Sequence, residues 1–336
     1  MLSKIIVSPS PHISRADSTR SIMLDVIIAL APAVGAAWWF FRTRAMIIVG
    51  VCVISCVITE WLCNVIRRKP NSLGDLSAVV TGIILALSLP AAIPFWAAII
   101  GSVFAIAIAK MVFGGLGSNV FNPAMAARAF LAASFGMLMT TWTVPATVEG
   151  SDIMLSATSK TPITQATPLA WSKEAIKEKA KADVANNMLK ESFIGGVGGC
   201  LGETSAVALL IGGAYLLIRK TIALHIPLAV LLSGFAFAAI AYFINSERFV
   251  SPLLHMTTGG MLLCAFFIAT DPVTAPLSSK GMWIFGVGLG ILIMLIRIVG
   301  EYPEGVMFAV LIMNAVAPLI DRFCKIIPAG GIITNE

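Results

Sequence analysis

Three threonine hydroxyls, those of Thr161, Thr164 and Thr167, lie in the proline-containing segment TPITQATPLA, which spans residues 161–170. A hydroxyl becomes a strong nucleophile only when a neighbouring group activates it. The segment matches no phosphate-binding glycine loop, metal-ligand pattern or hydrolase elbow. Its residue types alone therefore assign it no chemistry.

A second group of polar residues lies inside apolar sequence, in the run Gly114–Leu131 (GGLGSNVFNPAMAARAFL). Its glycines allow the backbone to approach a ligand, and Asn119 and Asn122 offer hydrogen-bond donors and acceptors. Arg128 stands where a charge is costly unless it faces a cavity, a partner or an anion. The run is typical of a polar ligand or cofactor pocket. A tight helix connection, with Arg128 reaching the membrane surface, is the alternative.

Four acids fall in or beside apolar segments: Asp25, Glu60, Glu203 and Asp271. A carboxylate inside a membrane is costly and commonly serves a cation or proton pathway. The four are therefore candidates for ion coupling. A position at the membrane interface is the simpler alternative, above all for Glu60 and Asp271.

The cysteines and histidines predict no metal centre. The six cysteines form no CxxC pair, and the three histidines are isolated from one another. No pattern indicates a catalytic side chain, a nucleotide site or an iron–sulfur ligand set. We therefore expect the chain to bind neither NAD nor ferredoxin alone.

The composition is that of a protein with many membrane spans. Hydrophobic residues make up 58% of the chain and charged residues 12%, against roughly 45–50% and about 25% in soluble domains. The formal net charge is +6, but the cations cluster at the ends of apolar runs, as membrane topology requires. This distribution argues against a nucleic-acid partner.

Ten apolar segments are long enough, or nearly so, to cross a bilayer as helices. They divide the chain into a cytoplasmic N-terminal segment (1–20), a first five-helix half (21–140), a polar loop (141–200), a second five-helix half (201–320) and a cytoplasmic tail (321–336). The predicted helices are Ser21–Phe41, Ala45–Ile66, Leu73–Leu89, Ile93–Phe113, Val120–Thr140, Leu201–Ile218, Ile222–Ile244, Leu253–Ala269, Gly281–Val299 and Gly305–Ile320.

The two halves show a weak internal repeat. Thr81–Pro90, Trp96 and Asn122-Pro123 follow one another in the first half, and Thr258–Pro272, Trp283 and Asn314 do so in the second. With five helices in each half, such a repeat is inverted across the membrane, as in many transporters. The fold expected is therefore all-α and integral to the membrane, with two inverted five-helix repeats. Chance recurrence of glycine and proline is the alternative.

The distribution of lysine and arginine predicts the orientation. Arg67-Arg68-Lys69 and Arg219-Lys220 fall on one side together with both chain ends, which places these ends in the cytoplasm. Arg42 and Arg44 oppose this orientation. The polar loop, including a lysine-rich helix expected over Ser172–Lys190, then lies on the outer face and carries Thr167 there.

Three motifs together resemble the RnfD/NqrB family over essentially the whole chain: Gly114–Leu131, the TDPVTAP sequence of residues 270–276, and ATPL at 166–169. The family includes RnfD, a membrane subunit of the Rnf ferredoxin:NAD oxidoreductase, and NqrB, its counterpart in the sodium-translocating NADH:quinone oxidoreductase. The short segment before the first helix favours the Rnf protein, in a bacterial or archaeal cytoplasmic membrane.

The resemblance implies two flavins. Family members carry FMN joined through its phosphate to the last threonine of a pattern similar to Asp-x-x-(Ser/Thr)-Gly-Ala-Thr. Thr167 takes that place here, which would make the chain a phosphoprotein, and Thr164 and Ala166 match the pattern, whereas Thr161 and Gln165 differ from it. A second, noncovalent riboflavin is also implied, and we expect it near Asn119, Asn122 and Arg128.

The resemblance also implies the function and the partners. The chain would pass electrons within a multisubunit complex, coupled to translocation of Na⁺ or H⁺. Its partners would be other membrane and peripheral subunits, among them a second covalent-flavin subunit and iron–sulfur subunits, and a flavin transferase would mature it. A stand-alone transporter or channel without flavin, and a scaffold without redox function, are the alternatives.

Overall fold

The computed structural model describes residues 18–70, 72–143, 167–178, 189–196, 198–300, 302 and 304–324. In these residues the chain is helical, with turns and a single isolated bridge between Pro90 and Cys200. An all-α fold is therefore confirmed for the described part of the chain.

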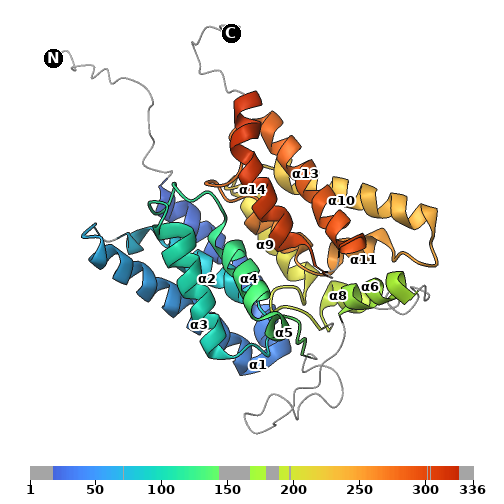
Figure 1. The fold of residues 1–336 in the computed structure, drawn as a ribbon, viewed down its shortest axis with the longest axis horizontal. Helices are drawn as coiled ribbons and strands as arrows, with labels where there is room; N and C mark the ends of the chain where they lie inside the picture. Colours follow the sequence, from blue (N-terminus) through green and yellow to red (C-terminus); the bar gives the residue numbers. More distant parts are fainter. Residues whose placement is uncertain are drawn as a thin grey trace, which may run out of the picture.

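The first element, α1 (Thr19–Ile66), contains two of the predicted segments. A straight helix of this length would extend about 72 Å at 1.5 Å per residue, far beyond the hydrocarbon core of a bilayer. The helix breaks at Arg42, which adopts φ 53° and ψ −145°. Two arms result, one on each side of Arg42, and Figure 1 shows the chain turning back between them.

The remaining helices of the first half are short. The 3-10 turn η1 (Leu73–Asp75) precedes α2 (Ser77–Leu87). Next, α3 (Phe95–Val103) continues into the π-helix η2 (Phe104–Met111). The fifth predicted segment is divided into α4 (Pro123–Ser134) and α5 (Gly136–Met139), because Phe135 leaves the helical conformation with φ −132° and ψ 47°. The prediction of one continuous helix over Val120–Thr140 is wrong on this point.

The second half contains three long apolar helices and one broken segment. The helices α10 (His225–Ile244), α13 (Ser279–Ile298) and α14 (Val306–Phe323) are regular, and α9 (Ala206–Ile218) is shorter. The segment predicted as one helix, Leu253–Ala269, instead forms α11 (Pro252–Thr257), α12 (Met261–Leu263) and the π-helix η4 (Cys264–Ile268). The break occurs because Thr258 is extended and Gly259 has a φ of +65°.

Between the halves, the described residues form α6 (Pro168–Glu178) and α8 (Leu189–Ile194). The helix expected over Ser172–Lys190 therefore begins earlier, at Pro168. Residues 179–188 lie outside the described part of the chain.

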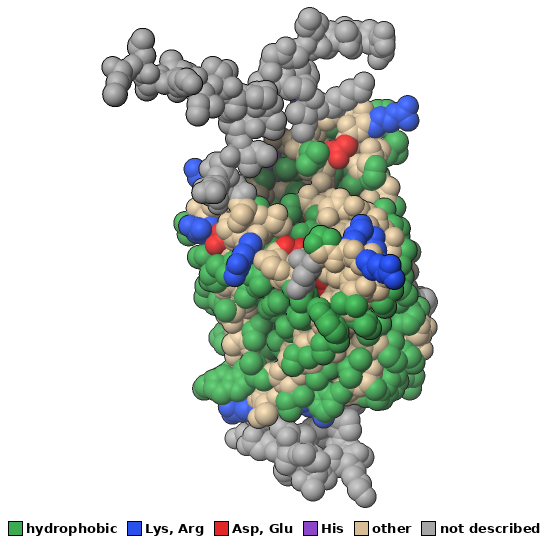
Figure 2. Space-filling model, turned by 90° about the vertical axis from the view of Figure 1, so that its left-hand side faces the viewer, with side chains coloured by type: hydrophobic (Ala, Val, Ile, Leu, Met, Phe, Trp, Pro, Cys, Tyr) green, Lys and Arg blue, Asp and Glu red, His purple; other side chains and the backbone are tan. Residues whose placement is uncertain are grey.

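Length and hydropathy support several membrane spans. Four described helices are long and apolar enough to cross a bilayer, namely α1, α10, α13 and α14, and α2, the α3–η2 helix and α9 are shorter apolar helices. Figure 2 shows the matching surface, on which hydrophobic side chains cover the middle of the molecule and lysines and arginines lie toward its two ends. The chain is therefore a multi-pass membrane protein.

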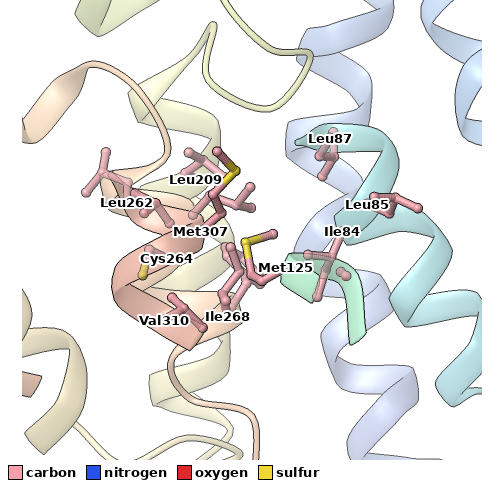
Figure 3. Close-up of a cluster of buried hydrophobic side chains, with 14 of the residues drawn as sticks. Ile84, Leu85, Leu87, Met125, Leu209, Leu262, Cys264, Ile268, Met307 and Val310 are labelled. Carbon is pink, nitrogen blue, oxygen red and sulfur yellow. The ribbon is translucent and has the colours of Figure 1, made fainter. Parts of the chain in front are cut away.

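Small residues bring the helices into close contact. A Cβ atom on Gly212 of α9 would overlap the carbonyl oxygen of Ala29 on α1, and one on Gly290 of α13 would overlap Ser233 Oγ on α10. Such approach is typical of membrane helix packing. Between the halves, Met125 of α4 lies among Ile84 of α2, Ile268 of η4 and other buried apolar side chains (Figure 3).

Candidate functional site

The larger of two candidate ligand sites is a cavity of about 730 Å³, here called the asparagine cavity. It lies where α1 begins, where α9 ends and where η4 meets the turn after it. Its walls combine apolar side chains with a few polar ones. The residues that line it include Met23, Val80, Thr81, Ile84, Lys110, Asn119, Asn122, Ala124, Leu216, Phe266, Phe267 and Asp271.

Asn119 carries a buried oxygen without a partner. The side chain is 5% exposed, and its Nδ2 donates to the carbonyl of Phe121 at 3.2 Å. Its Oδ1, in contrast, is buried with no hydrogen-bond partner in the described structure. Because a buried acceptor left unpaired costs about 1–3 kcal/mol, this atom indicates a missing donor from a bound ligand.

Asn122 begins α4. Its Oδ1 accepts from the backbone N–H groups of Ala124 at 3.1 Å and Met125 at 3.2 Å, and Pro123 occupies the first helical position. Both features are favoured at helix N-termini. The asparagine therefore holds the start of α4 at the cavity wall.

Replacement of Asn122 by alanine is expected to destabilise the protein by about 1 kcal/mol, because the cap of α4 is lost. Aspartate or serine at the same position keeps a capping oxygen and should restore most of the stability. Thermal unfolding of the purified chain in detergent measures both effects. Equal loss in the alanine and serine variants would show that the cap is not the cause.

Asp271 also lines the asparagine cavity. Its Oδ1 accepts from the backbone N–H of Val273 at 3.3 Å, and its Oδ2 accepts from Thr274 Oγ1 at 3.2 Å. Asp25 lies beside the cavity without lining it. It accepts from Tyr215 Oη at 3.2 Å and pairs with Arg219 at 3.4 Å, which joins α1 to the end of α9.

Glu60 is fully buried and pairs with a lysine. Its Oε2 lies 2.7 Å from Lys110 Nζ, and the two side chains are 0% and 2% exposed. Lys110 belongs to η2 and reaches the wall of the asparagine cavity. The carboxylate is therefore not at an interface but inside the protein.

The second candidate site, here called the threonine cavity, has a volume of about 410 Å³ and is lined by Thr167, Glu203, Glu304 and residues around them. Thr167 is 7% exposed, and its Oγ1 accepts from the N–H of Ala170 at 3.0 Å. The hydroxyl thus lies at the N-terminus of α6 and faces the cavity.

Arg128 lies beside the threonine cavity rather than the asparagine cavity. Its Nη2 lies 3.2 Å from Cys200 Sγ and 3.5 Å from Glu203 Oε1, and it forms a short ion pair with Glu304. Cys200, Glu203 and Glu304 are close enough together to ligate a metal ion. The guanidinium already supplies the positive charge at all three groups, so this arrangement is an ion-pair cluster.

A second buried arginine supports the same region. Arg297 of α13 donates to the carbonyls of His255 at 2.6 Å and Thr258 at 3.1 Å, at the break between α11 and α12. Glu304 Oε1 accepts from the N–H of Gly260 at 2.6 Å. The two ionic side chains therefore hold the broken segment open beneath Thr167.

The structure sorts the predicted residues into two groups. Asn119, Asn122 and Asp271 share the asparagine cavity, whereas Thr167, Glu203 and Arg128 gather around the threonine cavity. Thr164 and Ala166 lie outside the described residues.

Lys110, Glu304 and Arg297 were missed by the sequence reasoning. Lys110 and Arg297 stand inside apolar runs, which is the signal that had singled out Arg128. Glu304, in a polar connection, carried no such signal.

These features describe a helical membrane protein in which broken helices and buried ion pairs surround internal cavities, as in transporters and membrane redox subunits. The chain belongs to the NQR2, RnfD, RnfE family, whose profile matches residues 6–330. The family resemblance inferred from the sequence motifs is confirmed.

Relatives of known assignment cover almost the whole chain. The D subunit of the Na⁺-translocating ferredoxin:NAD⁺ oxidoreductase complex of Acetobacterium woodii is 43% identical, over 96% of this chain and 94% of the relative. The D subunit of the proton-translocating ferredoxin:NAD⁺ oxidoreductase complex of Clostridium ljungdahlii is 38% identical, over 96% of each. The D subunit of the ion-translocating oxidoreductase complex of Yersinia pseudotuberculosis is 38% identical, over 95% of this chain and 96% of the relative.

Proposed function

We propose that the chain is the membrane-embedded D subunit of an ion-translocating ferredoxin:NAD⁺ oxidoreductase complex. The observation that carries this proposal is similarity along nearly the full length of both chains to proteins of that name. Such a protein is part of an oxidoreductase and translocase and works only with its partner subunits. The names of the relatives include both Na⁺ and H⁺, so the transported ion stays open.

The asparagine cavity is the proposed site of a noncovalent flavin, riboflavin. A flavin ring is a flat aromatic body whose polar edge carries one N–H between two carbonyl oxygens. The cavity offers apolar walls from residues such as Ile84 and Phe266, and the amides of Asn119 and Asn122. The unpaired Oδ1 of Asn119 suits a ring N–H. Asn119 and Asn122 would hold the polar edge, and the flavin would supply the redox chemistry.

Thr167 is the proposed attachment point of FMN, and the hydroxyl oxygen would carry the phosphate as an ester. Its place at the N-terminus of α6 supports this assignment, because backbone N–H groups and the helix dipole favour negative charge there. The neighbouring cavity gives the attached group a space within the protein. Thr164 and Ala166 would complete the motif that the transferase recognises.

The arrangement of the chain ends supports the proposed orientation. The start of α1 and the end of α14 lie at the same end of the molecule (Figure 1), as expected if both termini are cytoplasmic. The threonine cavity lies at the opposite end of α9 from the asparagine cavity, which would bring Thr167 to the outer face. We further propose that the short α2 and the broken α11–η4 segment are corresponding members of two inverted five-helix repeats.

Mass spectrometry of the chain purified with its flavin transferase tests the proposal. The intact mass should exceed the sequence mass by one FMN ester, and acid extraction should release additional riboflavin. Ala124→Phe, which places a large ring in the asparagine cavity, should lose the extractable flavin and keep the ester. Val103→Phe on the exposed face of α3 is the matched control. A chain with neither flavin would favour a transporter without redox function.

A further inference from the structure

The buried pair of Lys110 and Glu60 has no task in the flavin assignments made above. Its members come from η2 and the second arm of α1 and are almost completely shielded from solvent. Burying two charges is costly even when they are paired, and charged groups inside membrane proteins commonly serve transport or proton transfer. The position of the pair between two cavities indicates which of these applies.

One cavity beside the pair is the asparagine cavity, to which Lys110 and Ser77 contribute. The other, here called the basic cavity, has a volume of about 740 Å³ and is lined by Asn64, Arg67, Lys69, Ser72 and Asp75, among others. Lys69 is exposed, so the basic cavity reaches the protein surface. The pair therefore separates a surface cavity from an internal one.

Two hydrogen-bonded routes cross this separation. In the first, Ser72 Oγ donates to Glu60 Oε1 at 2.5 Å, and Glu60 Oε2 accepts from Lys110 Nζ at 2.7 Å. In the second, Ser77 Oγ accepts from Lys110 Nζ at 2.6 Å and donates to Asp75 Oδ1 at 2.6 Å. Each route begins at a residue of the basic cavity and ends at Lys110.

Lys110 is also the natural counter-charge of the asparagine cavity. Among the described residues that line this cavity, it is the only lysine or arginine. Arg67 is engaged elsewhere, because it donates to the carbonyl of Met111 at 2.6 Å. Negative charge added to the cavity would act mainly on the ammonium of Lys110, because the surroundings screen charge weakly.

We propose that Lys110 and Glu60 form a proton relay that delivers one proton from the basic cavity to the asparagine cavity for each electron that arrives there. The relay rests on the proposed flavin in the asparagine cavity. One electron comes from a flavin or iron–sulfur centre of a neighbouring subunit, and the proton on Lys110 Nζ moves to the bound ligand. A proton from the basic cavity then restores the ammonium through Ser72 and Glu60, or through Asp75 and Ser77. One electron and one proton are gained in total, and the pair returns to its starting charge.

Two variants of the assembled complex separate proton transfer from charge compensation. Lys110→Arg keeps a positive charge, but arginine does not release its proton in proteins. The double variant Lys110→Met with Glu60→Gln removes both charges, which avoids an unpaired buried carboxylate. Lys280→Met, at the exposed start of α13, is the control.

The measurements are the extractable riboflavin of each variant and the rate of its reduction in rapid-mixing experiments. We expect both relay variants to keep the flavin and to be reduced about 10²-fold more slowly, within the range of general acid catalysis. The control should match the wild type. Reduction of the relay variants at the wild-type rate overturns the relay and leaves the flavin assignment intact. Loss of flavin from Lys110→Arg also overturns it and makes Lys110 a binding residue. Absence of riboflavin from the wild type overturns the flavin assignment itself.

Discussion

Thr167→Ala is expected to abolish covalent flavin attachment completely, because the substitution removes the hydroxyl oxygen to which the phosphate would be joined. Denatured protein separated by gel electrophoresis should lose its flavin fluorescence under ultraviolet light. Riboflavin in the asparagine cavity should be unaffected, since Thr167 does not line that cavity. Electron transfer through the assembled complex should stop at the vacant position.

The same substitution removes the cap that Thr167 provides for α6, at a cost of about 1 kcal/mol. Thr167→Ser keeps both the cap and a hydroxyl, and should retain fluorescence. Thr140→Ala, which alters an exposed threonine after α5, is a suitable control. Undiminished fluorescence in Thr167→Ala would show that another residue carries the flavin.

Arg128→Met is expected to reduce the free energy of unfolding by about 3–5 kcal/mol, as breaking a buried ion pair does when its partner stays charged. The substitution leaves Glu304 and Glu203 without the cation that now lies between them. Because Arg128 belongs to α4 and the two acids to the second half, the contact between the halves should weaken most. Thermal unfolding in detergent and the yield of folded protein report the loss.

A triple variant, Arg128→Met with Glu203→Gln and Glu304→Gln, removes all three charges together. It should recover a large part of the lost stability, since no carboxylate is then left unpaired. Arg219→Met is the matched control: Arg219 pairs with Asp25 but is 56% exposed, so its removal should cost at most about 1 kcal/mol. Similar losses in Arg128→Met and Arg219→Met would contradict the role assigned to the cluster.

Apolar length and charge placement were sufficient to predict most helices. The segments that became α10, α13 and α14 agree with the structure within a few residues, because long apolar runs leave few other structures possible in a membrane. The breaks at Phe135 and Thr258 were not predicted. Hydropathy does not change at these points, and the broken segment at Thr258 is held by distant groups, Arg297 and Glu304.

The candidate sites show the same limit. Polar residues inside apolar sequence identified Asn119, Asn122 and Arg128, but sequence spacing suggested a single pocket for all three. Asn122 and Arg128 are six positions apart on α4 and its cap, and Arg128 points to a cluster formed with residues of the other half. Which cavity a helix residue faces depends on packing partners far away in the chain.

The apolar cluster around Met125 has an electrical consequence. It fills the space between the asparagine and threonine cavities (Figure 3), which lie at the two ends of α9, about 20 Å apart along its axis at 1.5 Å per residue. Water and mobile ions are excluded from such packing, so much of the membrane voltage falls across it. An electron passing between the two proposed flavins would do work against that voltage, up to about 2.3 kcal/mol per 100 mV for a full crossing. The rate of that step should therefore depend on whether the membrane is energised, even with every contact in the protein unchanged.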